Sequence, residues 1–240
     1  MSRFANRTGG SRRMLIALAG VGMLAAACDF HYRAAADPAL DEVVVQTIPS
    51  AKPGFDHPAR LSTQDLTSIL QEVRVEFKTH WLQKLITGPL EPVPLFNSEV
   101  LTRVAPVLVG ALEKAGTRDR VVFYVAERRS SDRRDITSGS LFVKGRSLTL
   151  ALANHQNRVD VVPGLAAYDR NAPEVAVAPQ RFSLVFGRNE FVIEPELSFV
   201  DGVFGAAPPL LMVDYARFLQ HKSRSAASSG FPWSPGAPVP

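Results

Sequence analysis

The feature that most constrains this chain is an apolar stretch near its N-terminus, SRRMLIALAGVGMLAAAC at positions 11–28, which ends on the only cysteine in 240 residues. Because a single cysteine cannot form a disulfide within one chain, the fold must be held together by its hydrophobic core. The uncharged run from Met14 to Ala27 is shorter than the roughly 20 residues that a helix needs to cross a bilayer. A basic start, an apolar middle and small residues at the exit therefore indicate a cleaved export signal.

The segment LAAAC at 24–28 resembles the lipobox of bacterial lipoprotein precursors, with Ala25 where that family usually has leucine. The resemblance implies cleavage before Cys28, a diacylglycerol thioether on its sulfur and usually a third acyl chain on its new amino group. Several acyl chains make a stable membrane anchor, whereas one chain binds a membrane only reversibly. We therefore expect a lipid-anchored protein on the periplasmic side of the cell membrane or the outer membrane.

Two alternatives for this N-terminal segment stay open. The first is that Cys28 is an unmodified, buried cysteine that follows an ordinary cleaved signal. The second concerns the export route: the pair Arg12 and Arg13 ahead of the apolar run looks like a twin-arginine signal, which would imply export of a folded domain. The two arginines equally fit the basic start of any export signal.

Removal of the signal changes the net charge of the chain. The full chain has 27 Lys and Arg against 23 Asp and Glu, and the signal contains four arginines and no acidic residue. The mature chain is therefore close to neutral. Because nucleic-acid-binding proteins normally keep a basic excess, we expect no nucleic-acid partner. A hydrophobic share of 46% predicts a folded core.

The sequence predicts one globular domain with flexible ends. We expect a signal peptide at 1–27, a lipidated tether at 28–41, a single globular domain at 42–222 and a disordered tail at 223–240. The tether is polar and rich in alanine, and the tail is rich in serine, glycine and proline.

Within the domain, hydrophobic periodicity predicts an α+β fold: an antiparallel sheet built from hairpins, with two N-terminal helices and a C-terminal helix. The predicted helices cover about 63–84, 97–115 and 209–222, and the predicted strands include 42–48, 120–127 and 175–178. We expect hairpin tips near Gly145 and Gly187. Two points are less regular. Alternation of Val73, Val75 and Phe77 leaves a strand open in the second half of the first helix, and Pro106 should kink or split the second.

Two polar clusters are candidate sites. In ANHQNRVD at 153–160, His155 and Asp160 could position a general base for Ser138 or Ser140 as nucleophile, although such residues are also typical of a solvated loop. In ERRSSDRRD at 127–135, four arginines could grip phosphate or carboxylate groups of lipid headgroups or cell-wall peptide. These are Arg128, Arg129, Arg133 and Arg134. Neighbouring acids equally suit a self-neutralised hairpin tip.

Neither cluster is sufficient to identify a reaction. The five histidines are scattered without metal-ligand spacing, so we expect no metal, and no motif indicates a cofactor. We therefore assign no catalytic residue and expect a non-enzymatic binding or assembly component whose partner is an envelope protein. The alternative is an envelope hydrolase or cell-wall-binding enzyme that uses a site near His155.

Overall fold

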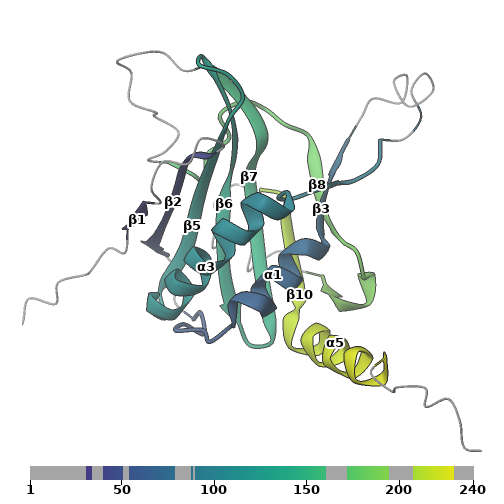
Figure 1. Cartoon of the computed structure of the whole chain (residues 1–240). Coiled ribbons are helices and arrows are strands. Elements are labelled where there is room, and N and C mark those ends of the chain that lie inside the picture. The colour runs from purple at the N-terminus through teal and green to yellow at the C-terminus, as the bar shows by residue number, and fades with distance from the viewer. Residues whose placement is uncertain are drawn as a thin grey trace, which may run out of the picture.

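The computed structural model describes residues 31–33, 40–50, 54–78, 88, 90–160, 172–194 and 208–229 (Figure 1). Cys28, the signal peptide, most of the expected tether and the tail beyond residue 229 lie outside the described residues. The described part combines antiparallel sheets with helices, which confirms the predicted α+β class.

Two sheets make up the β part of the described chain. The strands are β1 (His31–Arg33), β2 (Leu40–Pro49), β3 (Val73–Phe77), β4 (Val93–Pro94), β5 (Asp119–Arg128), β6 (Arg133–Lys144), β7 (Ser147–Asp160), β8 (Phe182–Phe186), β9 (Val192–Ile193) and β10 (Leu210–Asp214). The larger, seven-stranded sheet has the order β1-β2-β5-β6-β7-β10-β9, and the smaller, three-stranded sheet has the order β4-β3-β8. The helices are α1 (Thr63–Glu72), α3 (Ser98–Lys114) and α5 (Tyr215–Ser229), and a short 3-10 helix, η2, spans Asn189–Phe191.

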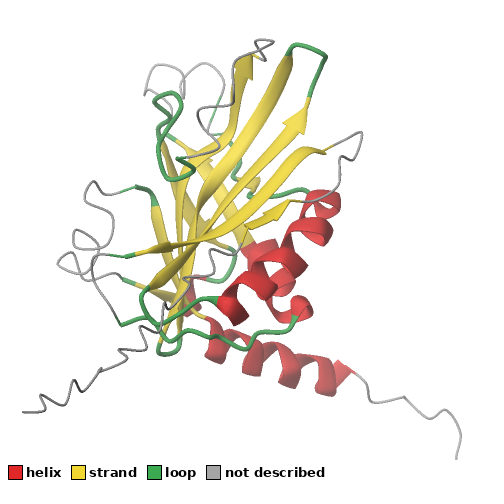
Figure 2. Ribbon diagram, turned by 90° about the vertical axis from the view of Figure 1, so that its left-hand side faces the viewer, coloured by secondary structure: helices red, strands yellow, loops and turns green. Residues whose placement is uncertain are grey.

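The hydrophobic core lies between the larger sheet and helices α1 and α3, which cover one face of that sheet (Figure 2). Alternate residues of the central strands point into this core, among them Val121, Phe123 and Val125 of β5. Both helices begin at side-chain caps, since Ser62 Oγ accepts from the amide of Asp65 and Asn97 Oδ1 accepts from the amide of Val100.

The first predicted helix is confirmed up to Glu72 and wrong over Val73–Phe77, and its last part, residues 79–84, lies outside the described residues. It ends at Glu72, and Val73–Phe77 form β3, which pairs with β8 over its whole length. Val73 and Val75 are buried on the side of the core, and Arg74 and Glu76, which alternate with them, are exposed. The alternating pattern therefore corresponds to a strand, and β8 is the strand with which this segment pairs.

The second predicted helix is confirmed as α3, but Pro106 does not split it. The helix is continuous over 17 residues from Ser98 to Lys114. Pro106 is exposed, and so is Thr102, whose carbonyl loses its helical donor because proline has no amide hydrogen. On this face water can replace the missing bond.

Of the two expected hairpins, the first is confirmed and the second is wrong. Lys144 pairs with Ser147 around a two-residue turn in which Gly145 has a φ of 59°. At Gly187, however, the chain leaves β8 and enters η2 and then β9, which pairs with β10 in the larger sheet. The two runs that flank Gly187 therefore belong to different sheets.

The remaining predicted elements differ in detail. The strands at 42–48 and 120–127 are confirmed as parts of β2 and β5, whereas residues 175–178 form no strand. The predicted helix at 209–222 is wrong over Leu210–Asp214, which form β10 beside β7. Helix α5 continues to Ser229, so it includes the first residues assigned to the tail. The hydroxyls of Ser223 and Ser225 donate to the carbonyls four residues earlier in this helix.

Candidate functional site

The polar cluster at 153–160 is part of a strand rather than a loop. Strand β7 continues to Asp160 and pairs with β6 over its whole length, with register shifts opposite Ile136, Ser138 and Gly139. Gly139 lies at the tightest point, because a Cβ there would come within 2.2 Å of the carbonyl oxygen of Ala151. The bulges turn Asn154 and Asn157 toward the face of the sheet opposite the helices, where the segment 172–180 crosses it.

Asn154 is the centre of a hydrogen-bond network that holds this segment. Its Nδ2 donates to Ser138 Oγ and to the carbonyl of Val175, both at 2.8 Å. Its Oδ1 accepts from the amide of Val177 at 2.8 Å and from Asn157 Nδ2 at 3.0 Å. The side chain is 1% exposed and all four of its hydrogen-bonding positions are used. Asn154 therefore links two strands to a segment that has no regular structure.

Gln180 completes the attachment at the other end of the segment. Its Oε1 accepts from the backbone amide of His155 at 2.9 Å, and its Nε2 donates to the carbonyl of His155 at 2.8 Å. The carboxamide thus bonds both backbone groups of one residue, as a neighbouring strand would. Strand β10 pairs with β7 up to Ala151, and the amide of Leu152 donates to the carbonyl of Pro209. Further along β7, the two bonds to Gln180 take the place of a partner strand.

The imidazole of His155 is buried against Phe77. It is 0% exposed, its ring centroid lies 5.8 Å from that of Phe77, and neither ring nitrogen has a hydrogen-bond partner in the described part of the chain. Burial away from water lowers the pKa of His155 to about 4, because desolvation disfavours the charged form. The ring is therefore neutral at pH 7.

The structure does not bring the other members of the predicted catalytic group to His155. Asp160 is exposed and forms an ion pair with Arg133, with 3.6 Å between Oδ1 and Nε. Ser138 accepts a hydrogen bond from Asn154. Ser140 Oγ is buried without a partner among the described residues, and it lines a pocket on the face opposite the helices. Without contact between base and nucleophile, this arrangement lacks the geometry of an activated serine.

The four arginines flank the tip of the β5–β6 hairpin, as their spacing predicts. Arg129 Nε donates to Asp135 Oδ2 at 2.6 Å, and this bond raises the pKa of Arg129. Arg133 pairs with Asp160, and Arg128 and Arg134 lie opposite each other on β5 and β6. Local acids therefore engage Arg129 and Arg133, and anion binding at this tip stays a prediction.

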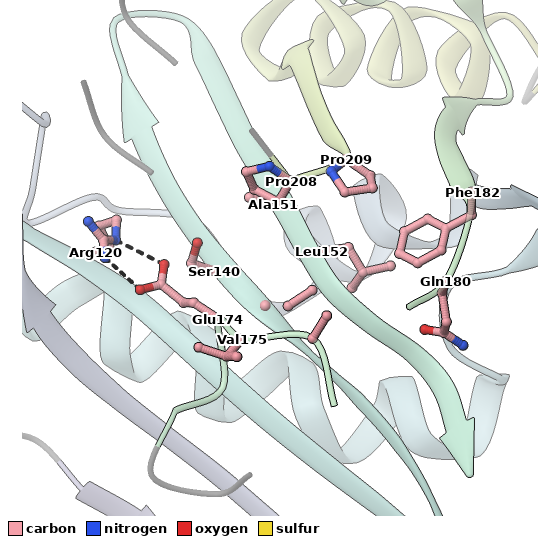
Figure 3. A pocket seen from close by; sticks show the side chains of 13 residues that line it. Arg120, Ser140, Ala151, Leu152, Glu174, Val175, Gln180, Phe182, Pro208 and Pro209 are labelled. Atoms are coloured by element: carbon pink, nitrogen blue, oxygen red, sulfur yellow. Dashed lines mark hydrogen bonds and ion pairs between the residues drawn. The ribbon is translucent and has the colours of Figure 1, made fainter. Parts of the chain in front are cut away.

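The candidate site is a pocket of about 430 Å³ on the face of the larger sheet that bears the segment 172–180 (Figure 3). Its wall is mostly apolar, with contributions from β7, β8, the segment 172–180 and the residues before β10. The apolar lining residues are Gly139, Ala151, Leu152, Ala153, Val175, Ala176, Phe182, Pro208 and Pro209. The small residues Gly139, Ala151 and Ala153 on the sheet leave space for the pocket on this face.

Four polar residues complete the lining. Arg120 and Glu174 form a two-bond ion pair at one end of the pocket, with Nε to Oε1 at 3.0 Å and Nη2 to Oε2 at 2.5 Å (Figure 3). Their side chains are 11% and 24% exposed. Ser140 and Gln180 are the other two. A concave, mostly apolar site with a few fixed polar groups is the usual form of a small-molecule pocket.

Sequence reasoning missed this pocket because its parts are far apart in the chain. Arg120 and Glu174 are 54 positions apart and Asn154 and Val177 are 23 apart. One signal was available: three amide residues, Asn154, Gln156 and Asn157, lie close together in a stretch rich in β-forming residues. Amides present both a donor and an acceptor, which suits them to bond backbone segments.

The described residues contain no group of three or more His, Cys, Asp or Glu residues placed to hold a metal ion. None of the helices in this part of the chain has the length and apolar character needed to span a bilayer. The fold and the pocket thus define an α+β domain with one candidate small-molecule site. No protein-family model matches the chain, and no curated protein and no solved structure matches it either.

Proposed function

We propose that this protein is a lipid-anchored, non-enzymatic binding component of the bacterial cell envelope, attached to the membrane through acyl chains on Cys28 and facing the periplasm, where it binds an envelope protein. The lipobox-like segment at 24–28 supports the anchor. The observation that carries the binding role is the mostly apolar pocket, whose wall at 172–180 is fixed by Asn154 and Gln180. A fixed wall lowers the entropy lost on binding.

The alternative, an envelope hydrolase that uses His155, has less support from the geometry. A general base must lie within hydrogen-bond reach of the proton that it takes. The imidazole of His155 contacts Phe77 in the core, and Asp160 pairs with Arg133 at the exposed end of β7. A hydrolase would have to use other residues.

The anchor is tested by acyl labelling in cells. Replacement of Cys28 with alanine should abolish incorporation of an alkyne-tagged fatty acid and should release the domain or leave uncleaved precursor. Ser228→Ala, a similarly small change at the other end of the chain, should label like the wild type. Membrane labelling that persists in Cys28→Ala would contradict the assignment.

The binding role is tested by site-specific crosslinking in intact cells. A photoreactive residue at Val175, which is 61% exposed and lines the pocket, should crosslink one envelope protein. The matched control is Val192, which is 38% exposed on β9 and does not line the pocket. Equal crosslinking from both positions, or none from Val175, would contradict a partner at this face.

A further inference from the structure

We propose that the pocket binds an uncharged amphiphile: an apolar chain or ring that carries one hydrogen-bonding group, which pairs with the hydroxyl of Ser140. This inference rests on the proposed function and extends it, because it adds a small-molecule ligand in the pocket to the protein partner proposed at the same face. It rests on three observations: the size and apolar lining of the pocket, the buried hydroxyl of Ser140, and the pairing of its two charged residues with each other.

The size and lining define the apolar part of the ligand. A volume of about 430 Å³ falls within the usual range for small-molecule sites. Nine of the thirteen lining residues are apolar, and three of them are alanines on β7 or the facing segment: Ala151, Ala153 and Ala176. Transfer of a chain or ring from water into this space is favourable for each CH₂ group buried.

The hydroxyl of Ser140 defines the polar part of the ligand. Ser140 is 1% exposed, and its Oγ has no hydrogen-bond partner among the described residues. Figure 3 shows it between the Arg120–Glu174 pair and Ala151 in the wall of the pocket. A buried hydroxyl is destabilising unless a partner satisfies it, and a serine hydroxyl can both donate and accept. A ligand hydroxyl, ester or amide supplies such a partner.

The ion pair favours a bound group without a net charge. Among the described lining residues, Arg120 and Glu174 are the only charged ones, and they bond each other through two short contacts. An ionised ligand group would either lie in the apolar part of the pocket without a counter-charge or break this pair. An uncharged group avoids both penalties.

The test is photoaffinity labelling of the full chain in lipid nanodiscs with an aliphatic diazirine alcohol. We expect saturable labelling of the peptides that contain residues 151–153 and 174–182. Excess 1-octanol should suppress this labelling, and octanoate, which has the same chain length and a negative charge at pH 7, should suppress it at least tenfold less effectively. If octanoate competes as well as 1-octanol, the uncharged-ligand inference is overturned.

Variants separate the two parts of the ligand. Ala153→Leu fills the pocket from the sheet and Ala176→Leu fills it from the facing segment, so each should abolish the saturable labelling. Ala178→Leu, on the same segment but outside the lining, is the matched control and should retain it. Saturable labelling that survives both pocket-filling variants overturns the proposal.

Ser140→Ala keeps the shape of the pocket and removes the hydroxyl. We expect half-saturation by the alcohol to need about two- to tenfold more probe, as fits the loss of one hydrogen bond. An unchanged half-saturation refutes the role of Ser140. Fatty-acid labelling at Cys28 tests the anchor separately, so the result of the ligand test does not depend on whether the chain is lipidated.

Discussion

Replacement of Asn154 with alanine should release the segment 172–180 from the sheet. The side chain donates to Ser138 and the carbonyl of Val175, and it accepts from Val177 and Asn157. Alanine removes all four bonds at once. It leaves the carbonyl of Val175 and the amide of Val177 without their partners, while Asn157 keeps a bond to the carbonyl of Ala178.

The expected loss of stability follows from those bonds. One hydrogen bond contributes about 0.5–1.5 kcal/mol net, so four give about 2–6 kcal/mol. Val175 and Val177 are exposed, so water can reach part of the released backbone once the segment moves. We therefore expect the lower half of that range, about 2–4 kcal/mol, in the free energy of unfolding.

Two measurements check this prediction. Urea denaturation reports the global free energy of unfolding, and native-state hydrogen exchange reports the protection of the Val177 amide. Both should fall in Asn154→Ala. The matched control is Asn189→Ala, since Asn189 is exposed on η2 and its side chain makes no hydrogen bond in the described part of the chain, so neither quantity should change by more than about 0.5 kcal/mol. An unchanged Val177 protection in Asn154→Ala would refute the reasoning.

Three further changes test other parts of the fold. Because the pKa of His155 is lowered to about 4 in the folded state, its unfolded form takes up a proton first as the pH falls, so stability should decrease by about 3 kcal/mol between pH 6.5 and about 4. His155→Phe should flatten that pH dependence in urea titrations, and an unchanged slope would rule out His155 as its source. Gly139→Ala should cost several kcal/mol in thermal unfolding, because the new Cβ would meet the carbonyl of Ala151 at 2.2 Å; near-wild-type stability would show that β7 can shift. Pro106→Ala should raise the free energy of unfolding by about 1–3 kcal/mol, since it restores a helical hydrogen bond in α3, and a decrease would contradict this account.

The parts of the fold that the sequence predicted correctly depend on local interactions. Helix α3 begins at an asparagine cap, and the β6–β7 turn depends on a glycine with positive φ, so both are determined by residues close in the chain. The α+β class follows in the same way from the periodicity of each segment.

The errors occur where a partner distant in sequence decides the structure. Val73–Phe77 can form a helical turn or a strand, and pairing with Phe182–Phe186 selects the strand. Gly187 is a plausible hairpin tip in the sequence alone. Its amide instead bonds the carbonyl of Glu72, which closes the smaller sheet and sends the chain on to β9. No local pattern contains that information.

The stretch around His155 shows why a polar cluster does not by itself identify a catalytic site. Asn154, Asn157 and Gln180 carry no charge and offer both donors and acceptors, so they can join two strands and an irregular segment at any pH. His155 takes part through its backbone only, while its ring lies on the opposite face of the sheet, against Phe77. The backbone of His155 therefore helps to hold the wall of the pocket, whereas its imidazole is the pH-sensitive group. It follows that His155→Phe should weaken the pH dependence of stability and leave binding in the pocket unchanged.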